Sequence, residues 1–208
     1  DSIKSIIDQL RHFGIKPVFI STEVVFNGTK GDYIESDEVD PILTYGRQKV
    51  EVEDYLQESG EDYAIIRLAM VYGAKRQDGT ILTGWLDAIE QGQTSRCAYD
   101  YLAAPIYVDD AVQGIIRVIE NDCHGLFHLS GPETFSRLDM YETLLTQTKK
   151  HGADTRARSA SCSMNDFDLV EKRPLNVSMR PDKIVNAVGL TLTGVEEVCS
   201  ILVKEAFR

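Results

Sequence analysis

Tyr45 and Lys49, four residues apart in the run Tyr-Gly-Arg-Gln-Lys, are of the types and spacing that acid–base chemistry uses. At this spacing the two side chains share one face of a helix, one turn apart. The lysine ammonium can lower the pKa of the phenol from its reference value of about 10, which makes it a usable acid or base near neutral pH. Ser21 and Thr22 precede the pair by about one element, so a neighbouring strand can add a hydroxyl donor. Such a set could act on a carbonyl and its alcohol.

The Tyr–Lys pair alone is a weak signal. With nine tyrosines in 208 residues, a Tyr-x-x-x-Lys spacing is expected by chance roughly 0.4 times. The interpretation therefore depends on the elements around the pair.

The flanking sequence predicts elements that would position these side chains. Residues 17–20 form a short apolar run, typical of a buried strand that ends at Ser21 and Thr22. Pro41 precedes a predicted helix of about 18 residues, which carries Tyr45 and Lys49 and closes at Gly60. The near-continuous apolar run 63–72 predicts the next buried strand.

The remaining sequence alternates between helical and strand patterns. We expect a helix at 3–13, a helix after the 73–79 loop, a strand pair at 96–99 and 105–108, and a helix opened by Asp109 and Asp110. Further on we expect a strand at 126–130, a helix capped by Ser136 with Asp139, and a strand at 156–164. An irregular stretch begins at 173, and a capping box at 193–196 opens the last helix.

This alternation predicts an α/β fold with right-handed βαβ units and a parallel sheet covered on both faces. We expect the C-terminal part of a Rossmann-like doubly wound sheet with a small C-terminal substrate lobe. The predicted sheet portion comprises residues 1–73 and 94–131. The predicted lobe comprises residues 74–93 and 132–208.

Composition narrows the classes of partner. A net charge of −11 and a pI of about 4.8 argue against nucleic acid or an anionic membrane as the main partner. No apolar run approaches 18 residues, and the first residues resemble neither a signal nor a transit peptide, so we expect a cytoplasmic protein. The cysteines are far apart without a Cys-x-x-Cys spacing, which predicts free thiols and no metal site: Cys97, Cys123, Cys162 and Cys199.

The fifteen glycines lack one familiar arrangement. None of them forms a G-x-G-x-x-G pattern between a strand and a helix. These 208 residues therefore contain no sequence signature of the phosphate cradle of a dinucleotide fold.

Five segments, in order, resemble the extended short-chain dehydrogenase/reductase superfamily. Within it they most resemble the dTDP-4-dehydrorhamnose reductases and their relatives, the regulatory β-subunits of methionine adenosyltransferase. The segments are 20–28, 41–49, 66–73, 104–111 and 173–176. Their order extends over nearly the whole chain.

The resemblance implies a catalytic set of Thr22, Tyr45 and Lys49. Tyr45 would protonate the ketone oxygen of a nucleotide-linked 4-keto sugar as hydride arrives from NADPH or NADH. Lys49 would bind the nicotinamide ribose and lower the pKa of Tyr45. Thr22 would hydrogen-bond the ketone and stabilise its developing charge.

The resemblance also implies binding roles around this set. Met70 and Val71 would border the nicotinamide, with Met70 also near the sugar. The nucleotide sugar would further contact Thr22, Glu23, Arg173 and Asn176. A homodimer or a partner enzyme is a further expectation.

The chain departs from the family pattern at three positions and in length. Glu23 stands where these reductases usually have aspartate, Val24 where they usually have tyrosine, and Met70 where they often have tryptophan. The family has roughly a hundred more residues before the first helix, which would carry the first strands and the glycine-rich turn.

Structural interpretations remain open beside the functional ones. Thr22 could simply end a strand, Arg67 could form a structural ion pair, and Arg173 could cap the C-terminal lobe. Asp109 and Asp110 fit helix capping better than chemistry. The acidic residues of the 35–38 loop read as solvated side chains, with magnesium binding as the alternative: Glu35, Asp37 and Glu38.

Two other functions also remain open. A non-catalytic regulatory or binding subunit would keep the fold and contact a partner enzyme. A nucleotide-sugar epimerase or dehydratase would share the Tyr–Lys pair.

Overall fold

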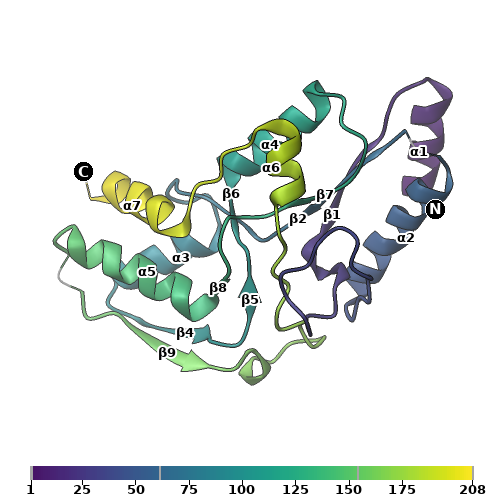
Figure 1. The fold of residues 1–208 in the computed structure, drawn as a ribbon. Helices are drawn as coiled ribbons and strands as arrows, with labels where there is room; N and C mark the ends of the chain where they lie inside the picture. Colours follow the sequence, from purple (N-terminus) through teal and green to yellow (C-terminus); the bar gives the residue numbers. More distant parts are fainter. Residues whose placement is uncertain (1, 61, 154, 208) are drawn as a thin grey trace.

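A three-stranded parallel sheet lies beside a lobe built mainly of helices in the computed structural model, which describes residues 2–60, 62–153 and 155–207 (Figure 1). The sheet has the order β1-β2-β7, and its register pairs Ile20 with Ile66 and Ile66 with Phe127. Its strands are β1 (Val18–Thr22), β2 (Ala64–Leu68) and β7 (Gly125–Leu129).

Helices cover both faces of this sheet. Successive side chains of β2 point to opposite faces, so neighbouring residues pack against different helices. Ile65 packs with Ile7 and Leu56, from the two helices of one face. Ile66 packs with Val118 and Ile184, from the two helices of the other face. The first pair is α1 (Ser2–His12) and α2 (Thr44–Glu58), and the second is α4 (Val108–Glu120) and α6 (Asp182–Val188).

The handedness of the two crossover connections differs from the prediction. The connections from β1 to β2 and from β2 to β7 advance in the same direction across the sheet, yet α2 and α4 lie on opposite faces. Two such crossovers have opposite hands, so the prediction of right-handed units is wrong for one of them. The connection from Leu68 to Gly125 runs through the lobe, so the strand twist that favours a short right-handed crossover does not constrain it in the same way.

The lobe has its own core, in which the fully buried Leu82, Leu144 and Leu202 meet. These leucines belong to three helices that gather at one end of the molecule in Figure 1. The helices are α3 (Ile81–Glu90), α5 (Arg137–Lys150) and α7 (Val195–Ala206).

Three further strand pairs complete the fold, β3 with β6, β4 with β9, and β5 with β8, and of these β4 and β9 pack against α5 in the lobe. The first two pairs are parallel and the third is antiparallel. Two short 3-10 helices, η1 and η2, complete the described elements. The bounds are β3 (Val71–Tyr72), β4 (Thr94–Ala98), β5 (Leu102–Ala103), β6 (Ile106–Tyr107), β8 (Phe135–Ser136), β9 (Arg158–Cys162), η1 (Glu23–Val25) and η2 (Met164–Asp166).

The parallel α/β architecture confirms the predicted fold class, and β9 confirms the strand expected near residues 156–164. The expected pairing of 96–99 with 105–108 is wrong, since β4 pairs with β9 and β6 pairs with β3. A strand pattern does not identify the neighbouring strand, and β9 lies far from β4 in the sequence. The division of residues into a sheet portion and a lobe stays a prediction.

The predicted starts of two helices can be compared with the structure. Ser136 and Asp139 form the predicted capping box of α5. The capping box predicted at 193–196 is wrong: Gly194 precedes α7 without a side-chain cap, and the Thr193 amide donates to Asp110 at 2.6 Å. Helix α6, with seven residues, lies in the stretch predicted to be irregular.

The sequence predicted neither a membrane-spanning helix nor a metal site, and the described helices and side chains can be compared with both predictions. None of these helices is long and apolar enough to cross a membrane. Within the same part of the chain, no cluster of three or more His, Cys, Asp or Glu side chains could hold a metal ion.

Candidate active site

The first turns of α2 present Tyr45 to solvent and turn Lys49 inward. Tyr45 is 52% exposed, whereas Lys49 is half-buried. The Lys49 ammonium lies 5.6 Å from the centre of the Tyr45 ring and donates a hydrogen bond of 2.7 Å to the carbonyl oxygen of Ile20. Burial lowers the pKa of Lys49, and the nearby Glu53 opposes that shift. The sequence-predicted pair is therefore assembled, with its lysine fixed to strand β1.

Gly46 allows α2 to begin close to the end of β1. A Cβ at this position would collide with the carbonyl oxygen of Val24, and it would lie 2.9 Å from the Pro41 side chain. Val24 lies in η1, two residues after Thr22. The glycine thus brings the Tyr45 end of α2 alongside the segment that carries Thr22.

Thr22 is buried at the carboxyl end of β1 and caps the turn that follows. Its hydroxyl oxygen accepts a hydrogen bond from the Val24 amide at 3.4 Å. Because this bond uses a lone pair of the oxygen, the hydroxyl hydrogen stays available for donation. The capping role is therefore compatible with the predicted contact to a ketone, which stays a prediction.

Glu23, a predicted substrate contact, is only 5% exposed. One of its oxygens accepts a hydrogen bond of 3.1 Å from the Met70 amide. Burial raises the pKa of Glu23 to about 8, although this hydrogen bond and Arg137 both act to lower it. Arg137 lies over Tyr101, 5.1 Å from the ring centre, and its buried Nε has no hydrogen-bond partner among the described residues. Glu23 thus lies in an incompletely compensated polar environment beside Thr22.

Met70 and Val71 lie where the two large cores meet. Met70 packs against the lobe core, and Val71 packs against the core between the sheet and α4. Met70 also accepts a hydrogen bond of 2.9 Å from the Ile106 amide. The Met70–Glu23 bond ties this segment to η1, so both predicted contacts are held close to the end of β1.

Tyr45 and Arg173 line the same pocket, of about 340 Å³. Leu43 and Tyr45 form one wall, and residues 168–171 with the exposed Arg173 form the other. The two walls are more than a hundred residues apart in sequence, and no local signal in the sequence joined them.

Asn176 forms hydrogen bonds with neighbouring residues of the protein. Its side-chain oxygen accepts hydrogen bonds from the Ser178 amide at 3.2 Å and the Ser178 hydroxyl at 2.8 Å. Its backbone amide donates to the Gly28 carbonyl at 3.1 Å. The structure therefore assigns Asn176 a role in holding the 27–33 loop, and a contact with substrate stays a prediction.

A buried ion pair lies one turn beyond Lys49 on the same face of α2. The Arg67 guanidinium donates to Glu53, with Nη2 at 2.7 Å and Nε at 3.2 Å, and the Ser21 hydroxyl also donates to Glu53. Glu53 is 1% exposed and Arg67 is 3% exposed. The structural interpretation of Arg67 is therefore confirmed. Glu53 was not among the predicted residues, although its position four residues after Lys49 places it on the same face of α2.

Three other acidic residues have structural partners. Asp110 accepts from the Thr193 amide and hydroxyl, and so ties α4 to the segment before α7. In the 35–38 loop, Asp37 pairs with Lys30 at 2.6 Å, while Glu35 accepts from the His128 amide at 2.9 Å.

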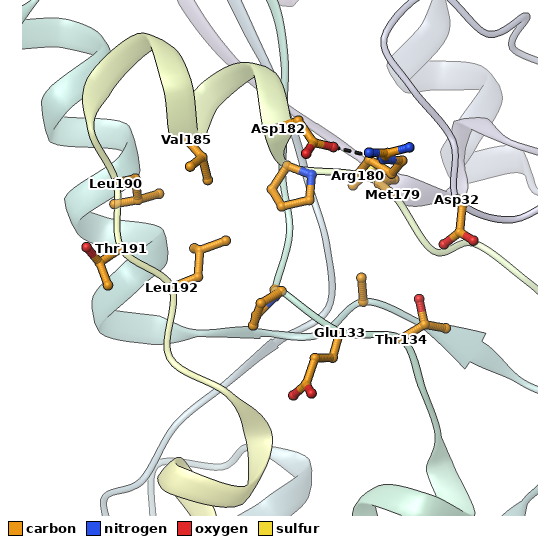
Figure 2. Close-up of a pocket in the computed structure, with 14 residues that line it drawn as sticks. Asp32, Glu133, Thr134, Met179, Arg180, Asp182, Val185, Leu190, Thr191 and Leu192 are labelled. Carbon is orange, nitrogen blue, oxygen red and sulfur yellow. Dashed lines mark hydrogen bonds and ion pairs between the residues drawn. The ribbon is translucent and has the colours of Figure 1, made fainter.

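A larger cavity, of about 670 Å³, lies away from these residues. Figure 2 shows it between α6 with residues 190–192 on one side and Glu133 with Thr134 on the other. Arg180 and Asp182 form an ion pair of 2.8 Å along its edge. None of the three predicted catalytic residues lines this cavity, whereas Tyr45, but neither Thr22 nor Lys49, lines the smaller pocket. We therefore take the smaller pocket as the candidate active site.

A known protein family matches almost the whole chain. The family described as RmlD substrate binding domain matches residues 1–206. The chain belongs to this family. The resemblance inferred from the five sequence segments is confirmed.

Individual relatives agree with the family match. The chain is 24% identical to a dTDP-4-dehydrorhamnose reductase of Sinorhizobium fredii over 206 residues, which are 95% of this chain and 68% of the relative. It is 25% identical to methionine adenosyltransferase 2 subunit beta of Danio rerio over 131 residues, or 59% of this chain and 40% of that protein. The chain thus spans about two thirds of the first relative and less than half of the second.

A solved structure supports the fold. The dTDP-4-dehydrorhamnose reductase of Bacillus anthracis, determined in complex with NADP, superposes with a TM-score of 0.83 at 20% identity. The match covers 97% of this chain and 70% of the reductase. At this identity the likeness establishes the Rossmann-like fold.

Proposed function

We propose that this chain carries the acid and the substrate-binding part of an NADPH- or NADH-dependent reductase of nucleotide-linked 4-keto sugars. The observation that carries the proposal is the assembly of an exposed Tyr45 one turn from a half-buried Lys49, with Tyr45 lining a pocket that also contains Arg173. Membership of the family and the match to a dTDP-4-dehydrorhamnose reductase support the substrate class.

Each residue of the set has a distinct task in reduction at C4 of the sugar. A reduced nicotinamide, when bound, would supply the hydride for the carbonyl carbon. Tyr45 donates its phenolic proton to the carbonyl oxygen, which becomes the alcohol, and its phenolate is reprotonated from solvent. Thr22 donates its free hydroxyl hydrogen to the same oxygen and stabilises negative charge as it develops.

Lys49 is suited to stabilising the Tyr45 phenolate. The ammonium has three donors, of which one is used by the Ile20 carbonyl, so the others remain for a cofactor ribose or the phenolate. Its attachment to β1 keeps a positive charge near the ring of Tyr45 before any ligand binds. This preorganisation is the property that makes charge stabilisation effective in catalysis.

The residues present fit one end of a nicotinamide cofactor. Lys49 and Tyr45 offer donors for the ribose, and Met70 and Val71 offer an apolar edge for the ring. The sequence contains no glycine-rich cradle for the phosphates.

The experiment is the conservative change Tyr45→Phe in the complete protein. It removes the phenolic proton and leaves the exposed ring in place. We expect reductase turnover with a dTDP-4-keto sugar to fall by about 10²–10⁴-fold, the range typical of a lost general acid. Binding of the nucleotide sugar, measured by titration calorimetry, should be nearly unchanged. Unchanged turnover would show that Tyr45 is not the acid.

A second candidate is a binding subunit that contacts another enzyme. The match to methionine adenosyltransferase 2 subunit beta favours it. NADPH fluorescence and the melting temperature with a dTDP-sugar distinguish the two on the purified chain. A response to the sugar favours the reductase, whereas no response to either ligand favours the binding subunit.

A further inference from the structure

The wall opposite Tyr45 is a loop that approaches α2 from a distant part of the sequence. Residues 168–173 form this wall, and Val170 is fully exposed at its tip. Arg173 lies in the same stretch and also lines a neighbouring pocket that contains Lys172. The width of the site therefore depends on where this loop lies relative to α2.

Glu171 fastens the loop to the first residue of α2. Its Oε1 accepts hydrogen bonds from the Thr44 hydroxyl at 2.7 Å and from the Thr44 amide at 3.1 Å. Oε2 lies 3.3 Å from the same amide. The Arg47 guanidinium lies 3.6 Å from Oε1 and donates to the Thr44 hydroxyl at 2.9 Å. Both partners of this carboxylate are within one turn of Tyr45.

The helix start needs such a group. The residue before α2 is Leu43, whose side chain cannot accept a hydrogen bond and provides no cap. The first amides of a helix are unpaired and carry partial positive charge, so a carboxylate placed there is stabilising. Glu171 supplies from 127 residues away the cap that the local sequence lacks.

We propose that Glu171 is a positioning residue that latches the 168–173 loop onto the start of α2 and so sets the spacing between Tyr45 and Arg173. The latch makes the two walls of the pocket one unit, although each belongs to a different part of the chain. In the proposed function, on which this last step rests, the latched Arg173 faces the diphosphate of the nucleotide sugar. A guanidinium held in place binds such a group with less loss of side-chain freedom.

Limited trypsin digestion tests the latch without any ligand. Lys172 lies in the latched loop, and Arg173 precedes Pro174, a bond that trypsin does not cleave. We expect Glu171→Ala to speed cleavage after Lys172 by about tenfold, the change that loss of a typical helix cap produces. Glu171→Gln, which keeps an acceptor oxygen but loses the charge, should fall between Glu171→Ala and the parent chain.

A matched control and a second readout keep the test decisive. Thr44→Val removes the hydroxyl that donates to Glu171 and leaves the residues around Lys172 unchanged, so it should also speed cleavage. Glu120→Ala, which removes an exposed glutamate from α4, away from this pocket, should leave cleavage unchanged. The affinity for dTDP-glucose, measured by titration calorimetry, should fall by roughly five- to tenfold in Glu171→Ala and remain constant in the control.

The outcomes separate this inference from the proposed function. Equal cleavage of Glu171→Ala and the parent chain would overturn the latch. Faster cleavage with unchanged dTDP-glucose affinity would overturn its role in setting the pocket. If the parent chain does not bind dTDP-glucose at all, the proposed substrate class is wrong, and the cleavage rates still decide whether Glu171 fastens the loop.

Discussion

Two glutamates are buried near the end of β1, and their environments differ. Glu53 on α2 receives hydrogen bonds from both Arg67 and Ser21, and the guanidinium engages both of its oxygens. Glu23, at the start of η1, accepts one backbone hydrogen bond from Met70. Burial raises the pKa of Glu23 to about 8, so its neutral form is favoured near neutral pH.

This difference separates residues that hold the site together, which we call its framework, from residues that are free to contact a ligand. A buried charge that is fully paired fixes the relative position of two elements, here α2 and β2. A buried carboxyl with few partners can change its protonation state or accept a partner from a ligand. Glu23 lies beside Thr22 and Met70, where the proposed sugar would bind, whereas Glu53 lies between α2 and the sheet, bonded to Ser21 and Arg67.

Breaking the framework pair should have the largest effect on stability. Glu53→Ala leaves the Arg67 guanidinium buried without its carboxylate. We expect the free energy of unfolding to fall by about 3–5 kcal/mol, measured by urea denaturation. The double variant Glu53→Leu with Arg67→Met removes both charges and should recover most of the loss. A single variant as stable as the parent would contradict the assignment of this pair to the framework.

Glu23→Gln should change how stability depends on pH. Between pH 4.5 and 8 the unfolded carboxyl is ionised while the folded one keeps its proton, so this group's contribution is present below its unfolded pKa and is lost as the pH rises. The parent should lose roughly 3 kcal/mol relative to Glu23→Gln between pH 5 and 7.5. Glutamine keeps an acceptor for the Met70 amide. Parallel stability curves for the two proteins would contradict the raised pKa.

Gly46→Ala should have a smaller effect on stability, and because it changes no charge, the effect reports on packing alone. The added methyl group meets the Val24 carbonyl, so α2 must move away from η1. We expect a loss of about 1–3 kcal/mol, typical of overpacking, measured by thermal denaturation. As a control, Gly84→Ala in α3 adds the same methyl group where no atom lies within 4 Å, and it should be neutral or stabilising. Equal stability of the Gly46 and Gly84 variants would show that α2 has room to adjust.

Local patterns predicted much of the fold. The apolar runs that became β1 and β2, and the helical spacing around Tyr45, were sufficient because neighbouring residues determine them. The partner of β4 was not predicted, since β9 lies far from it in the sequence, and α6 was not predicted, since its seven residues carry little pattern. The capping box at 193–196 failed because Asp110, distant in sequence, holds Thr193.

The sequence by itself determined that Tyr45 and Lys49 share a helix face, because a spacing of four is a property of the helix. It also contained the family's ordered segments. Only the tertiary structure decided that Lys49 is tied to Ile20, that Glu53 meets Arg67, and that Glu171 caps α2 across 127 residues. The physical reason is that a charged side chain takes its role from the groups that fold against it, and these come from distant parts of the chain.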